Sequence, residues 1–262
     1  MPTFDEQNET ITSNGVAYDF ADKKSKGLFL SKVFGMMFIC LLITTVIAAG
    51  FGYGFQALLN YTAVDGVYNQ DMILFLMIVL GVSAVGLIVM SFVLPIVFIR
   101  GRHNIIVPLM IYVSLMGILL SSFTFLFEPI ILVESFGITA IIFGTMGLIG
   151  YLSKGKMTGI GFILLGLLIG AGLISLINWS MILIKGISET NIMLSWIVSL
   201  AIFAFLMLIT MYDVYRIRRI AESGASQGNN LIYYCAFILY SDFIALLIRV
   251  IYFLALIVGR RK

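Results

Sequence analysis

The sequence predicts an all-α integral membrane protein that crosses the bilayer with seven helices. Of its 262 residues, 61% are hydrophobic and only 11% are charged, whereas a soluble domain needs far more charge to cover its surface. The apolar residues form runs of about 20 residues, each long enough for a helix to cross ~30 Å of hydrocarbon. These runs are too long and too uniformly apolar for the strands of a membrane barrel.

Each predicted span is bounded by polar, charged or turn residues. The spans lie at about 33–57, 72–99, 104–126, 131–152, 158–183, 192–215 and 231–257. The breaks run from Asn60 to Asp71, Arg100 to Asn104, Glu128 to Pro129, Ser153 to Lys156, Lys185 to Asn191 and Arg216 to Asn230. Three regions follow: a polar cytoplasmic tail at 1–32, expected to be mobile and unlike a secretory signal, a seven-helix membrane domain at 33–257, and a short basic tail at 258–262.

The distribution of basic residues over the loops predicts the orientation. Excess lysine and arginine marks the cytoplasmic side, so the amino terminus is predicted to be cytoplasmic. Seven crossings place the carboxyl terminus outside, in conflict with its basic ending Arg260-Arg261-Lys262. Either the last helix does not cross fully or this short tail is tolerated outside, and the second is preferred. The basic residues on the cytoplasmic side are Lys23, Lys24, Lys26, Lys32, Arg100, Arg102, Lys154, Lys156, Arg216, Arg218 and Arg219, whereas the other loops hold only Lys185, beside Asp65, Asp71, Glu128 and Glu189.

Several residues that often carry chemistry have an ordinary explanation in this sequence. Cys40 and Cys235 fall in apolar runs without a CxxC partner, so we expect buried small apolar residues and no zinc site. His103 is the only histidine, which excludes a histidine-rich metal site. The spacing Gly166-x-x-x-Gly170 is typical of close helix packing. No phosphate-binding motif is present, and we expect no cofactor and no nucleic-acid partner.

Ionisable residues inside the predicted spans are the best candidates for function, because burying charge in lipid is costly. Asp213 lies at the cytoplasmic end of the sixth span and Asp242 lies within the seventh. The loop between these spans is short enough to make them antiparallel neighbours, so the two carboxylates can face each other. Two close carboxylates in a low dielectric cannot both ionise cheaply, and they would share a proton and titrate together. When ionised, they become oxygen ligands suited to calcium.

A purely structural role explains the same residues. Asp213 could cap its helix near Arg216, one turn away, while Asp242 could form an ion pair with Arg249, two turns away on the same face. Arg100, at the cytoplasmic end of the second span, could be a snorkelling anchor. Spacing alone leaves both interpretations open.

Around these acids the chain resembles the Bax inhibitor-1 family of membrane proteins. The resemblance covers about residues 30–257. It rests on Tyr212-Asp213 leading into Arg216 and Arg218, on Ala236-Phe237-Ile238-Leu239-Tyr240-Ser241-Asp242-Phe243-Ile244 of the last helix, and on Glu134-Ser135-Phe136-Gly137-Ile138-Thr139 with Gly144 and Gly147 in the fourth.

The resemblance implies seven helices with the last one central and surrounded by the other six, and a pH-sensitive calcium leak. Carried over by motif, Asp213 and Asp242 are the proton-sharing latch, and Arg100 is the arginine that contacts it. The same two aspartates would bind calcium transiently as it permeates. The chain departs from the family where polar residues follow the second aspartate, since Ala245 and Arg249 stand there. Arg249 could oppose cation passage or modulate the pair.

Three functions are compatible with these residues, and the first is preferred. A passive calcium leak gated by protonation of the aspartate pair would be no enzyme, and would sit in a bacterial plasma membrane. A non-conducting regulator of stress or cell death would act through protein partners that the sequence does not identify. An intramembrane aspartyl protease also carries two membrane aspartates, but Leu239 and Ser241 occupy the glycine positions of its Gly-x-Gly-Asp motif.

Overall fold

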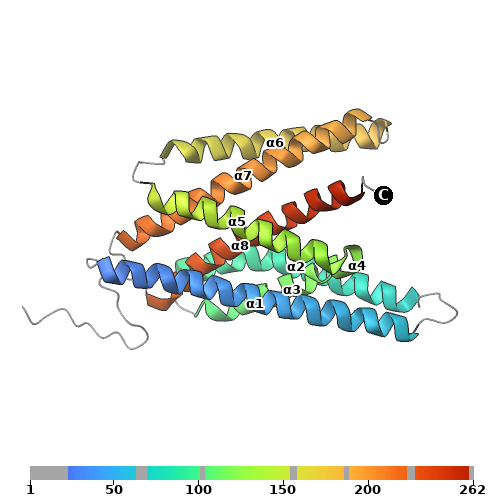
Figure 1. Ribbon diagram of the computed structural model, residues 1–262, viewed down its shortest axis with the longest axis horizontal. Coiled ribbons are helices and arrows are strands. Elements are labelled where there is room, and N and C mark those ends of the chain that lie inside the picture. Colours follow the sequence, from blue (N-terminus) through green and yellow to red (C-terminus); the bar gives the residue numbers. More distant parts are fainter. Residues whose placement is uncertain are drawn as a thin grey trace, which may run out of the picture. The chain divides into compact units, whose positions relative to one another are not determined.

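The computed structural model describes residues 23–62, 70–100, 104–153, 158–185, 189–222 and 228–259. Within these ranges nearly all residues are helical and there is no strand, which confirms the all-α class for that part of the chain (Figure 1). In chain order the helices are α1 (Lys23–Thr62), α2 (Gln70–Arg100), α3 (Ile106–Leu120), α4 (Phe123–Leu126), α5 (Pro129–Leu152), α6 (Thr158–Lys185), α7 (Glu189–Glu222) and α8 (Gly228–Gly259).

Each predicted span falls on a helix or, for the third, on the α3–α4 pair. α1 begins at Lys23, inside the segment that we expected to form the tail. Among the described residues, six stretches are long and apolar enough to cross a membrane: Gly27–Tyr61, Gln70–Arg100, Ile106–Leu126, Pro129–Leu152, Met193–Glu222 and Gly228–Ala255. In α6 the described residues supply a shorter apolar stretch, Gly166–Leu176. The seventh crossing therefore stays a prediction.

The chain divides into two compact units. Unit 1 comprises residues up to Pro129 together with Arg219–Tyr240, and therefore contains α1 to α4 and the first part of α8. Unit 2 comprises Ile130–Arg218 and the residues from Ser241 onward, and therefore contains α5, α6, most of α7 and the second part of α8. The last helix thus contributes to both units.

In unit 1, α3 packs against both α1 and α2. A glycine allows the closest approach: a Cβ atom at Gly117 would lie 2.8 Å from the side chain of Ile47 and 3.0 Å from the carbonyl oxygen of Thr44. Any larger residue at this position would force α3 away from α1.

The regular α-helical pattern of the predicted third span is interrupted between α3 and α4 at Ser121 and Ser122, which keep helical backbone angles while bonds between residues three apart replace the regular ones. The serine hydroxyls donate to carbonyl oxygens one turn earlier, Ser121 to Ile118 at 2.6 Å and Ser122 to Leu119 at 2.8 Å. Local bonds of this kind compete with the regular helical pattern and satisfy backbone groups near the break. The third span can therefore be interrupted while backbone groups around the break keep hydrogen-bond partners.

In unit 2, backbone contact joins α5 to α7, and aromatic side chains join α8 to both. A Cβ atom at Gly150 of α5 would collide with the carbonyl oxygen of Met211 of α7. Phe243 of α8 lies against two rings of α5, with centroid distances of 5.3 Å to Phe136 and 5.5 Å to Phe143. These contacts fix where the acidic residues of α7 and α8 lie.

α8 is the most buried of the six candidate spans. Of its most apolar window 61% is buried, against 11–33% for the other five. This burial fits a central last helix, although its surrounding by six helices stays a prediction.

Candidate functional site

The two membrane aspartates lie together in unit 2, one on each of the last two helices. The carboxyl groups of Asp213 on α7 and Asp242 on α8 lie close enough to interact with each other. Their neighbours explain why they meet. Met211 and Val214, on either side of Asp213, pack on α5, and Phe243, next to Asp242, packs on the same helix.

The surroundings of the pair favour a carboxyl group that carries a proton. Only 9% of the surface of Asp242 is exposed, and its buried Oδ2 has no hydrogen-bond partner in the part of the chain that the structure describes. Two ionised carboxylates have only acceptors to offer each other. A hydrogen bond between them therefore requires one proton, and that proton also relieves the cost of a buried charge.

Two cations lie on the same helices as the pair, and one of them acts on it. Arg216, three residues after Asp213, is exposed and close enough to attract that carboxylate electrostatically. Arg249 is half-buried, with its guanidinium 5.9 Å from the ring centroid of Tyr252. Among the described residues no ion pair joins Arg249 to Asp242. Asp213 thus has a neighbouring cation, Arg216, as a structural role requires. The charged neighbour of Asp242 is instead an acid, Asp213.

Comparison with known proteins places these residues in a family. The family model described as "Inhibitor of apoptosis-promoting Bax1" matches residues 27–259. The chain belongs to the Bax inhibitor-1 family. The inner membrane protein YbhL of Escherichia coli, found in two strains, is 28% identical over 233 residues, which cover 85% of this chain and 89% of YbhL. The family resemblance predicted from the sequence is confirmed, and the chain is an integral membrane protein with bacterial relatives.

The third residue carried over from the Bax inhibitor-1 family, Arg100, is the exposed last residue of α2. It belongs to unit 1, whereas the aspartates belong to unit 2. Its contact with the latch stays a prediction. Arg102, the other arginine of this loop, and His103 lie outside the described residues.

The pair is not built as a resident metal centre. In the ranges described above, no group of three His, Cys, Asp or Glu residues could hold a metal ion. Calcium takes six to eight oxygen ligands, so two carboxylates could hold it only in passing, with water completing its shell. Calcium contact at Asp213 and Asp242 stays a prediction. Cys40 and Cys235 are both buried, which confirms their expected place in the core.

Sequence reasoning missed two polar contacts near the site. The hydroxyl of Tyr240, two residues before Asp242, lies 2.6 Å from that of Thr44 on α1. Arg218, five residues after Asp213, donates to carbonyl oxygens at the end of α5. The only signal for the first was a tyrosine in an apolar run. The only signal for the second was a helical spacing of seven from Met211 to Arg218.

Proposed function

We propose that the chain is a pH-sensitive calcium leak channel of a bacterial plasma membrane, with a cytoplasmic amino terminus and no enzymatic activity. One observation carries the proposal: two carboxyl groups from consecutive membrane helices lie close together, and one of them is nearly fully buried. Such an arrangement changes its charge, and therefore its energy, with proton concentration.

In the proposed closed state, Asp213 and Asp242 share one proton. With it, Asp213 and Asp242 carry one negative charge between them, and a charge-assisted hydrogen bond holds α7 to α8. Without it, two negative charges repel each other in a poorly screened environment. The helices then separate at this level, and the freed carboxylates become hard oxygen ligands that calcium prefers. The leak is therefore closed at low pH and opens as pH rises.

Two arginines are expected to influence the proposed leak. Arg100, as the expected contact of the latch, would stabilise the ionised acids. Arg249 lies seven residues beyond Asp242 on α8. If it faces the pathway, its charge opposes calcium entry and keeps the leak slow. No cofactor is needed, because calcium moves down its own gradient.

Calcium flux into dye-loaded proteoliposomes tests the proposal. Flux through the native protein is expected to rise from acidic to alkaline pH, and Asp213→Asn or Asp242→Asn is expected to abolish this dependence. Glu134→Gln is the matched control, because it removes an exposed acid from α5 without touching the pair. Absence of flux at every pH, or native profiles in both aspartate variants, would overturn the leak.

A second candidate is a non-conducting regulator of stress or cell death. It is favoured by the description of the matching family model, which names inhibition of another protein, and by a half-buried cation on α8. In this case the aspartate pair would still respond to pH but would change a binding surface. A pH-dependent rearrangement of α7 and α8 without calcium flux at any pH would favour this function.

A further inference from the structure

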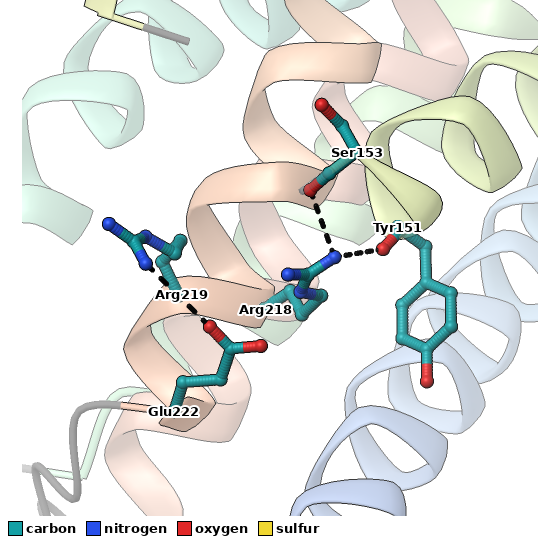
Figure 2. A network of polar contacts seen from close by, with 5 residues as sticks. All are labelled: Tyr151, Ser153, Arg218, Arg219 and Glu222. Carbon is teal, nitrogen blue, oxygen red and sulfur yellow. Dashed lines mark hydrogen bonds and ion pairs between the residues drawn. The ribbon is translucent and has the colours of Figure 1, made fainter. Parts of the chain in front are cut away.

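An arginine of α7 holds the end of α5. The Nη1 atom of Arg218 donates hydrogen bonds to the carbonyl oxygens of Tyr151 and of Ser153, the latter at 3.1 Å (Figure 2). The last carbonyls of a helix lack donors within it and carry partial negative charge. The guanidinium also lies 5.9 Å from the ring centroid of Tyr151. Arg218 therefore acts as a carboxyl-terminal cap that α7 supplies to α5.

The same two helices touch at two further levels. A Cβ atom at Gly150 would collide with the carbonyl oxygen of Met211, so the backbones are in contact there. One turn earlier on α5, a Cβ atom at Gly147 would lie 3.7 Å from Val214. Met211, Val214 and Arg218 recur at helical spacing and so share one face of α7. Asp213 lies within this anchored stretch.

The other aspartate is held differently. Phe243, beside Asp242, touches α5 through the rings of Phe136 and Phe143. Ring contacts of this kind are individually weak and can be rearranged by rotation of side chains, whereas backbone contact leaves no side chain to move. At the level of the pair, α7 is therefore joined to α5 by backbone contact and a helix cap, whereas the ring contacts described here join α8 to α5 through side chains.

Charges around the pair do not reverse this difference. Arg216 attracts Asp213 on its own helix, and Arg249 lies against Tyr252 on α8. On α5 the only acid is the exposed Glu134, and α6 carries no charged residue before Lys185.

We propose that Arg218 and Gly150 are positioning residues of the pH gate. They keep Asp213 seated on α5, so that loss of the shared proton displaces α8 with Asp242 and leaves α7 in place. This inference rests on the proposed function for its consequence, because it names the helix that moves. Its mechanical content can be measured without calcium.

Distances between spin labels in liposomes, recorded at acidic and alkaline pH, test the inference. Labels at the exposed positions Ile149 on α5, Leu200 on α7 and Ile248 on α8 would follow the three helices, after Cys40 and Cys235 are replaced with alanine. The α5–α8 distance is expected to lengthen as pH rises, while the α5–α7 distance stays constant. An α5–α7 distance that changes as much as the α5–α8 distance would overturn the inference.

Two neighbouring arginines supply a matched pair of variants. Arg218→Gln is expected to make the α5–α7 distance pH-dependent and to lower calcium flux at alkaline pH, because α7 now yields to part of the repulsion. Arg219→Gln removes the same charge from the same turn, where it lies 3.9 Å from Glu222 (Figure 2), and is expected to leave the α5–α7 distance constant. Equal behaviour of the two variants would contradict a positioning role.

Gly150→Ala gives an independent readout. Its methyl group is expected to lengthen the α5–α7 distance at every pH, and helical circular dichroism checks that the variant folds. The positioning role and the calcium leak can be refuted independently of each other. Distances that behave as expected without any flux would overturn the leak alone, whereas pH-dependent flux with a moving α7 would overturn the positioning role alone.

Discussion

Two buried polar side chains of α8, two residues apart, have opposite surroundings. Tyr240 is fully buried, and its hydroxyl is paired with that of Thr44, which also donates to the carbonyl oxygen of Cys40 at 2.9 Å. Asp242 is almost as buried, but its partner is another acid. A neutral, satisfied hydrogen bond stabilises the fold at every pH, whereas a bond between two acids depends on a proton. One helix thus carries a permanent contact in unit 1 and a conditional one in unit 2.

The aromatic surroundings add to this difference. The ring of Tyr112 lies edge-on to both Tyr240 and Phe237, with centroid distances of 6.1 Å and 5.1 Å. Edge-to-face contacts contribute about 0.5–1.5 kcal/mol each beyond the area that they bury. The first part of α8 therefore has several independent contacts within unit 1.

The largest effect is expected from Tyr240→Ala, which breaks the permanent contact. Removing a buried aromatic side chain leaves a cavity, and the free energy of unfolding should fall by about 3–5 kcal/mol. Unfolding with a denaturing detergent, followed by circular dichroism at acidic and alkaline pH, measures this loss. The loss should be the same at both pH values. Tyr252→Ala, at an exposed position of α8, is the control and should cost less.

Asp242→Asn tests the conditional contact and should have the next largest effect. If the native pair keeps a proton that an exposed aspartate releases, as proposed, the native state binds more protons than the unfolded state. Stability should then fall as pH rises, by at most about 1.4 kcal/mol per pH unit for one proton. The asparagine variant should lose this slope in the same unfolding experiment. Asp71→Asn, an exposed residue of α2, should keep it, and a native protein without any slope would contradict proton sharing.

A double-mutant cycle of Tyr240→Phe and Thr44→Val isolates the hydroxyl pair. The coupling energy should be about 1 kcal/mol, since a neutral hydrogen bond contributes about 0.5–1.5 kcal/mol. It should not change with pH. A coupling that vanished at alkaline pH would show that the two contacts of α8 act as one.

The smallest effect is expected from Arg249→Gln. Loss of its contact with the ring of Tyr252 should cost about 0.5–1 kcal/mol. Because no ion pair between Arg249 and Asp242 occurs in the described part of the chain, the pH slope of stability should remain. A steeper slope in this variant would identify Arg249 as the counter-ion of Asp242 and revive the structural interpretation of that residue.

Apolar runs were sufficient to predict the helices but not their interruptions. The run 231–257 predicts the long α8 (Gly228–Gly259), because only an apolar helix is stable in lipid. The predicted run 104–126 gave no sign of the break at Ser121, since serine hydroxyls can bond to the backbone inside a continuous helix as well. The local amino-acid composition therefore does not distinguish an interrupted helix from a continuous one.

The candidate site could likewise be predicted only in part from the sequence. Asp213 and Asp242 were predictable, because a carboxylate in an apolar run is costly enough to require an explanation. The cap by Arg218 was not, because three arginines lie close together there and only the contact of Gly150 with Met211 decides which of them faces α5. The pairing of Thr44 with Tyr240 joins residues 196 positions apart, a separation at which a single sequence carries no signal of contact.

The interrupted third span has a consequence for the choice of lipid. Ile106–Leu126 contains 21 residues, whereas Gly27–Tyr61 in the neighbouring α1 contains 35. At 1.5 Å per residue these lengths are ~31 Å and ~52 Å if both stretches are straight helices. A hydrocarbon layer of ~30 Å suits the short span upright, whereas the long one must lean or project into the headgroups. Membrane thickness should therefore change the crossing of α1 and α3, so that lipid chain length would act on unit 1 independently of acidity.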